Sequence, residues 1–157
     1  MEEIQLYAFD LDGTLLDTAP DFFYAVNKLR EANGFESGDF SEVRSRVSEG
    51  AASLARYSLN WDENQKEEIE KSRLEWLEIY EKCCMGAKLF DGMNEVLINL
   101  NKRNKNWGIV TNKPRKFAEQ IVNEKFSLIK PDFLICPDDV GVRKPSPKGL
   151  ELACKLT

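Results

Sequence analysis

The chain has 157 residues, of which 42% are apolar and 31% are charged. This length is typical of one globular domain, or of one domain with a small insertion. The net charge of −5 and the lack of a dense basic patch speak against a nucleic-acid partner. No apolar run approaches the roughly 18 residues that span a membrane, and the start, MEEIQLYAFDLDG, lacks the features of a signal peptide. We therefore expect a cytoplasmic protein that does not enter the membrane.

Histidine is absent, and none of the four cysteines forms a C-x-x-C pair. The absence of histidine excludes Ser–His and Cys–His nucleophile systems, and the cysteine spacing speaks against a zinc or redox site. Acid–base chemistry near neutral pH must then fall to carboxylates, lysine, tyrosine or cysteine.

The first predicted element is a short β-strand over residues 4–10, an apolar run that ends at a glycine-containing turn. The spacing of apolar residues predicts the remaining elements. In chain order they are helices over 20–33, 41–59 (interrupted near Gly50), 63–84 and 92–104, a strand over 107–110, a helix over 115–125, a strand over 133–136 and a helix over 147–156.

Alternating strands and helices with continuously apolar strands predict a parallel sheet flanked by helices. The first strand is separated from the others by a long helical stretch. We therefore expect an α/β core made of residues 1–16 and 88–157, with a helical insertion at 17–87.

Two aspartates follow the first strand, Asp10 and Asp12 in the segment FDLDGT. In an extended chain residues i and i+2 point the same way, so their carboxylates repel unless a cation or a proton intervenes. This arrangement is expected if one carboxylate takes a metal and acts as a nucleophile while the other carries a proton. A calcium loop is excluded, because its required sixth-position glycine is replaced by Leu15.

Two further polar segments follow later strands: Thr111-Asn112-Lys113 after residues 107–110, and Arg143-Lys144-Pro145 after residues 133–136. A hydroxyl and backbone amides at a strand end can bind a phosphate oxygen, and a lysine held beside prolines can neutralise one. In open α/β sheets, sites form outside the carboxyl ends of the strands. The three segments are therefore expected to converge.

Together and in this order, these segments resemble the haloacid dehalogenase superfamily, in particular its phosphoglycolate phosphatase-like branch. The resemblance implies a Rossmann-like parallel-sheet core with an inserted α-helical cap at 17–87. It also implies Mg²⁺-dependent hydrolysis of a small-molecule phosphate monoester through an aspartyl-phosphate. The implied substrates are 2-phosphoglycolate or a sugar phosphate such as N-acetylmuramic acid 6-phosphate, and the implied state is a monomer or a homodimer.

The resemblance also implies roles for individual residues. Asp10 corresponds to the nucleophile and Asp12 to the general acid/base, and Asp10 with the main-chain carbonyl of Asp12 corresponds to the Mg²⁺ ligands. Thr111 corresponds to a ligand of the transferred phosphoryl group, and Lys144 to the cation that steadies Asp10 and that group.

Substrate contacts are expected in the core at Thr14 and Asn112, and in the cap at Arg44 and Gly50. The cap segment VRSRVSEGA resembles the family's substrate-selecting loop. Glu49 stands where a neutral residue is more usual, which weakens the case for a small dianionic substrate.

The family's fourth motif, an acidic G-D-x-x-x-D segment after a further strand, is missing from the 157 residues. Asp138 and Asp139 cannot replace it, because they precede Lys144. We therefore expect a fragment of a longer enzyme, with weak or no activity of its own. Two other functions stay open: a phosphomutase of the same fold, and an inactive fragment that acts only as a phosphate-binding or interaction module. A dehalogenase is disfavoured, because dehalogenases normally lack an acid at the Asp12 position.

Overall fold

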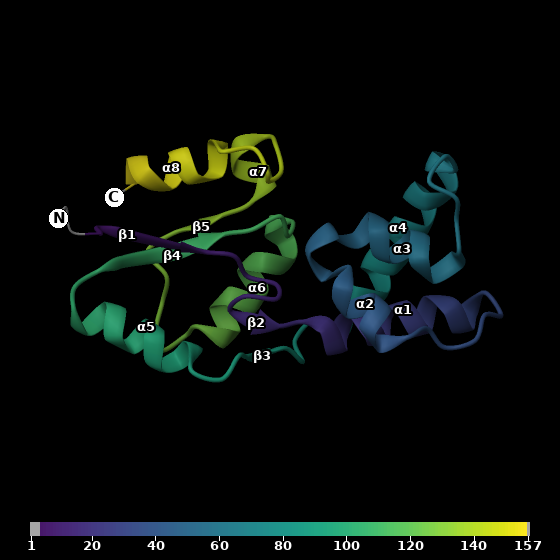
Figure 1. Ribbon diagram of the computed structural model, residues 1–157, viewed down its shortest axis with the longest axis horizontal. Helices are drawn as coiled ribbons and strands as arrows, with labels where there is room; N and C mark the ends of the chain where they lie inside the picture. The colour runs from purple at the N-terminus through teal and green to yellow at the C-terminus, as the bar shows by residue number, and fades with distance from the viewer. Residues whose placement is uncertain (1–3, 157) are drawn as a thin grey trace. The chain divides into compact units, whose positions relative to one another are not determined.

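The computed structural model describes residues 4–156, and the chain divides into two compact units (Figure 1). One unit is Met1–Asp17 with Lys88–Thr157, and the other is Thr18–Ala87. The helical unit therefore begins after Asp17, one residue later than the boundary that the sequence predicted. No helix within residues 4–156 is long and apolar enough to cross a membrane.

The first unit is built on a parallel sheet of three strands in the order β1-β4-β5. These strands are β1 (Leu6–Phe9), β4 (Asn106–Val110) and β5 (Leu134–Ile135). Phe9 is paired in register with Ile109, which in turn is opposite Leu134. The predicted parallel sheet is thus confirmed, and its strands place their carboxyl ends along one edge.

Helices cover both faces of this sheet, as Figure 1 shows. Helices α5 (Met93–Lys102) and α6 (Arg115–Lys125) lie on one face, and α8 (Lys148–Leu156) lies on the other. A one-turn helix that the sequence did not predict, α7 (Pro137–Val140), follows β5. The α/β class predicted from the sequence is confirmed.

Two glycines allow close packing in this unit. A Cβ atom on Gly108 of β4 would lie 2.6 Å from ring atoms of Phe133, and one on Gly149 of α8 would lie 2.8 Å from a methyl group of Val110. Both distances are too short for any other residue without rearrangement. The absence of a side chain therefore brings β5 and α8 close to the central strand.

A two-stranded antiparallel ribbon, β2 (Leu16–Asp17) with β3 (Lys88–Leu89), completes the first unit. It joins the segments on either side of the insertion. The sequence did not predict it, because strands of two residues carry no periodicity.

The second unit is entirely helical: α1 (Ala19–Ala32), α2 (Phe40–Ser45), the 3₁₀ turn η1 (Val47–Glu49), α3 (Ala51–Leu59) and α4 (Lys66–Glu81). The predicted interruption falls at Gly50, whose φ of 88° favours glycine. In the core of the helical unit, the Trp76 and Tyr80 rings are stacked with their centroids 5.0 Å apart, and the Phe22 ring lies edge-on to both. Helix α4 is three residues shorter at each end than the predicted 63–84.

Candidate active site

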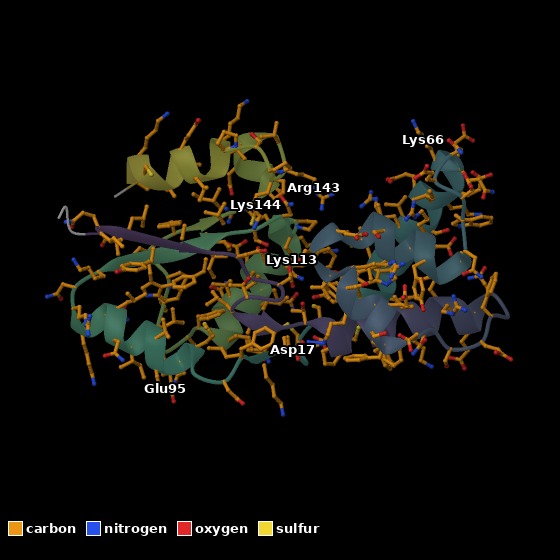
Figure 2. The ribbon with its side chains drawn as sticks, viewed as in Figure 1. Asp17, Lys66, Glu95, Lys113, Arg143 and Lys144 are labelled. Carbon is orange, nitrogen blue, oxygen red and sulfur yellow. The ribbon has the colours of Figure 1, made fainter. Side chains whose placement is uncertain are left out.

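The loops that follow β1, α7 and β4 bring Asp10 and Lys144 together. The Lys144 Nζ atom lies 2.8 Å from Asp10 Oδ1 and donates a hydrogen bond of 2.9 Å to the carbonyl of Val110, the last residue of β4. The same Asp10 oxygen accepts the main-chain N–H of Leu11 at 2.8 Å. Lys144 is thus held against both the first and the central strand. Figure 2 labels Lys144 and also Lys113, which belongs to the same unit.

The second aspartate has a different lysine partner. Lys113 Nζ donates to Asp12 Oδ1 at 2.9 Å. The two side chains are 3% and 12% exposed, so this ion pair is shielded from the screening by water that weakens surface pairs. Each carboxylate of the Asp10–Asp12 pair therefore has its own ammonium group, which relieves the repulsion expected between them.

Lys113 was assigned no role by the sequence analysis, although it stands in the second polar segment. Nothing in local spacing connects it to Asp12, because the two residues are 101 positions apart. One signal was available: two neighbouring carboxylates need compensating cations, and Lys113 follows the strand that pairs with theirs.

Thr111 is buried at the end of β4. Its main-chain N–H donates to the Ile135 carbonyl at 3.0 Å, and its Oγ1 accepts the main-chain N–H of Lys113 at 3.1 Å. A hydroxyl that accepts in this way still has its own hydrogen to donate. Thr111 can therefore offer a hydrogen bond to an anionic oxygen.

The Asn112 side chain holds the Lys144 loop. Its Oδ1 accepts the main-chain N–H of Lys144 at 2.6 Å, and its Nδ2 donates to the Lys144 carbonyl at 3.2 Å. Arg143 adds a longer bond of 3.4 Å to the Asn112 carbonyl. Asn112 was predicted to contact substrate, but in this structure its side-chain amide fixes the backbone of Lys144.

The remaining predicted contact residues lie in two places. Thr14 is exposed in the turn that follows Gly13 in the α/β unit. Arg44 and Gly50 belong to the helical unit. The Arg44 guanidinium lies over the Phe40 ring at 5.4 Å, and Glu49 accepts a hydrogen bond from the Ser53 hydroxyl.

Two oxygen atoms of the site suit a magnesium ion. Within residues 4–156, Asp10 Oδ2 and the main-chain carbonyl of Asp12 accept no hydrogen bond from another group. Across the same part of the chain, no group of three or more His, Cys, Asp or Glu side chains could hold a metal ion. Mg²⁺ is commonly bound by one or two carboxylates, with waters and substrate phosphate completing its ligands. The two free oxygens fit that kind of site.

Two cysteine thiols, one buried and one half-buried, are poor competitors for the role of nucleophile. Burial raises the pKa of Cys136, next to β5, to about 12, and burial together with the Asp21 charge raises that of Cys83 to about 11. Because the thiolate is the reactive form, both thiols are inert near neutral pH. Neither thiol therefore competes with the carboxylates as a nucleophile at that pH.

The first unit is a Rossmann-like α/β core with a helical insertion after its first strand. Carboxylates, lysines and a hydroxyl gather at the carboxyl edge of its parallel sheet. A profile of the haloacid dehalogenase-like hydrolase family matches residues 4–157. The chain belongs to that family, which confirms the resemblance drawn from its sequence.

Curated relatives carry phosphatase names. The chain is 42% identical over 148 residues to N-acetylmuramic acid 6-phosphate phosphatase of Pseudomonas putida, covering 94% of this chain and 66% of the relative. The same-named protein of Pseudomonas aeruginosa is 41% identical over 159 residues, with 98% and 69% covered. A phosphoglycolate phosphatase of Xanthomonas campestris is 37% identical over 148 residues, with 92% and 65% covered. The chain thus spans about two thirds of the length of these relatives.

Solved structures share the fold. A haloacid dehalogenase-like hydrolase from Bacteroides fragilis superposes with a TM-score of 0.82 at 21% identity, covering 98% of this chain and 72% of that one. A predicted phosphoglycolate phosphatase from Haemophilus somnus has a TM-score of 0.79 at 24% identity, with 99% and 72% covered. At these identities the likeness supports the fold alone.

Proposed function

We propose that the protein is a Mg²⁺-dependent phosphatase that hydrolyses a small-molecule phosphate monoester through an aspartyl-phosphate on Asp10. The observation that carries this proposal is the geometry of Asp10. One of its carboxylate oxygens is paired with Lys144 at 2.8 Å, while the other is left to react. Phosphoryl transfer depends mainly on positioning and on charge neutralisation, and this edge of the sheet offers both.

Four residues of the site have a part in the proposed reaction. Asp10 attacks phosphorus, while the Lys144 ammonium and the Thr111 hydroxyl stabilise the negative charge on the phosphoryl oxygens. Asp12 protonates the leaving oxygen, and in the second step it takes a proton from the water that hydrolyses the aspartyl-phosphate. Asp10 and the Asp12 carbonyl would hold Mg²⁺, which when bound neutralises charge between the nucleophile and the phosphate.

The helical unit, Thr18–Ala87, is proposed to act as the cap that selects the substrate. A sugar phosphate such as N-acetylmuramic acid 6-phosphate is favoured over 2-phosphoglycolate, because relatives named for the former are 42% and 41% identical to this chain. Arg44 is proposed to meet a polar or anionic group of the substrate. A cytoplasmic location and a monomeric or homodimeric state stay predictions.

The test is phosphate release by the protein as its gene encodes it, with Asp10→Asn as the variant and Asp91→Asn as a control. Asp91 is an exposed aspartate of the same unit. We expect Asp10→Asn to lower kcat by more than about a thousandfold, equivalent to roughly 4 kcal/mol of barrier, and Asp91→Asn to retain full activity. An Asp10→Asn protein with more than about a thousandth of the original rate would show that Asp10 is not the nucleophile.

Substrate choice is read from the same assay. We expect a higher kcat/KM for N-acetylmuramic acid 6-phosphate than for 2-phosphoglycolate, and we expect Arg44→Ala to change that ratio. Transfer of the phosphoryl group to a second sugar hydroxyl, without release of inorganic phosphate, would instead identify a phosphomutase. An unchanged ratio in Arg44→Ala would place substrate recognition elsewhere.

A further inference from the structure

Lys113 is buried, and its ammonium group is committed to Asp12. Lysine is rarely buried unless it is paired, and here the Nζ atom lies 2.9 Å from Asp12 Oδ1 with both side chains largely shielded from water. The contact joins the loop after β1 to the loop after β4, two strands that are neighbours in the sheet. The pair is therefore built into the edge that carries the site.

The same residue also orients a second group. Its main-chain N–H donates to Thr111 Oγ1 at 3.1 Å, so the Lys113 backbone sets the direction of the hydroxyl while its side chain sets that of the carboxylate. A charge-assisted hydrogen bond restricts a carboxylate more strongly than a neutral one does. Asp12 Oδ1 is engaged in this way, whereas Oδ2 accepts no hydrogen bond within residues 4–156.

We propose that Lys113 is a positioning residue for Asp12: it holds one carboxylate oxygen so that the other meets the leaving-group oxygen of the substrate. The inference rests on the proposed function, in which Asp12 is the general acid/base. It differs from direct binding of the phosphate by Lys113, because the Lys113 ammonium donates to Asp12 Oδ1 and its effect on the reaction then passes through Asp12.

This role has a consequence that a purely structural role lacks. A proton from Asp12 matters when the leaving group is a poor one, such as a sugar alkoxide, and matters little when it is p-nitrophenolate, which leaves without protonation. Loss of Lys113 should therefore slow the first step with a sugar phosphate far more than with p-nitrophenyl phosphate. A misfolded site or a lost phosphate contact would slow both.

The experiment compares Lys113→Met, Asp12→Asn, the double variant and Lys102→Met in the protein as its gene encodes it. Lys102 is an exposed lysine on α5 and serves as the matched control for loss of charge. Release of the first product is measured in single-turnover mode, and kcat and KM are measured in the steady state. Both measurements use saturating Mg²⁺, with N-acetylmuramic acid 6-phosphate and with p-nitrophenyl phosphate.

We expect Lys113→Met to slow cleavage of the sugar phosphate by about 10²- to 10⁴-fold, the usual contribution of general acid–base catalysis. Cleavage of p-nitrophenyl phosphate should fall by less than roughly tenfold on the same reasoning, with KM little changed. Lys113→Arg, which keeps a cation at this position, should retain more of the sugar-phosphate rate than Lys113→Met.

Two outcomes would overturn the proposal: an equal loss on both substrates, or a raised KM with kcat unchanged. If Lys113→Met fails to fold, the double variant, which is neutral at both positions, is compared with Asp12→Asn. Equal rates in those two support positioning through Asp12, and a further loss in the double variant contradicts it. Failure of the proposed function has a different signature, namely no phosphate release by the unmodified protein or full activity of Asp10→Asn.

Discussion

Among single residues, Gly108 shows how the central strand depends on a missing side chain. A Cβ atom there would approach three atoms of the Phe133 ring to 2.6 Å. Phe133 is itself buried, and its carbonyl accepts the N–H of Ile109 at 2.9 Å. The glycine therefore lets the ring pack directly on the backbone of β4 while the strands stay hydrogen-bonded.

We predict that Gly108→Ala destabilises the fold by about 1–3 kcal/mol, the usual cost of overpacking a core. Urea unfolding monitored by circular dichroism measures the change. Adding Phe133→Leu to Gly108→Ala should recover part of the loss, because the smaller side chain relieves the contact. Equal stability of Gly108→Ala and the unmodified protein would mean that the ring moves aside at no cost.

Among the elements, the start of α6 is tied to β5 and α7 by one arginine and one aspartate. Arg115 Nη2 lies 2.6 Å from Asp139 Oδ2 and donates to the Leu134 carbonyl at 2.9 Å. The same aspartate oxygen accepts the Cys136 N–H at 2.7 Å. Burial acts to raise the pKa of Asp139, but the bonds from Arg115 and from the Cys136 N–H together with the Arg115 charge outweigh it, so the pKa lies below its usual value.

The lowered pKa predicts how stability depends on pH. A carboxyl group whose pKa is lower in the folded state stabilises the protein above its unfolded pKa of about 3.9, and the contribution is lost as the pH falls through the folded value. Asp139→Asn should therefore reduce the free energy of unfolding by about 1 kcal/mol at pH 7, since both side chains are partly exposed. That difference should shrink as the pH falls below about 4.

Chemical denaturation of the two proteins across this pH range tests the prediction. Glu95→Gln, on the exposed side of α5, is the matched control and should change stability by less than about 0.5 kcal/mol throughout. A difference between Asp139→Asn and the unmodified protein that stays constant down to pH 2 would contradict the assignment.

For the whole molecule, the main feature is that each unit has its own core. Phe22 packs against Trp76 and Tyr80 in the helical unit. In the α/β unit, Val110, Phe133, Ile135 and Ala153 form a buried cluster. Since hydrophobic stabilisation follows buried contacts, damage to one core should act first on the unit that contains it.

We predict that Phe22→Ala destabilises the helical unit by about 3–5 kcal/mol and leaves the α/β unit largely protected. Amide hydrogen exchange should become faster in α1 and α4 and change little in β4. Phe117→Ala, in a buried position of α6, is the reciprocal control and should speed exchange in the α/β unit. Equal loss of protection in both units after Phe22→Ala would show that they unfold as one.

The sequence by itself determined the architecture and the three segments of the site. Continuous apolar runs of four or more residues placed β1 and β4, and helical periodicity placed all the long helices, because burial against a sheet imposes these patterns on the chain. The motif around Asp10 and Asp12, with Thr111 and Lys144 after later strands, was sufficient to predict the family. Asp10 and Lys144 were expected to converge because the carboxyl ends of parallel strands share one edge, and in the structure they form an ion pair.

Only the tertiary structure decided which side chains pair with which. The Lys113–Asp12 contact joins residues 101 positions apart, and the Asn112 amide binds the backbone of Lys144 from 32 positions away. Such contacts depend on the register between neighbouring strands and on the path of the loops that follow them, and neither leaves a periodic trace in the sequence. The ribbon of β2 and β3 escaped prediction for a related reason: its two-residue strands exist because the chain leaves and re-enters the α/β unit side by side, which folding alone establishes.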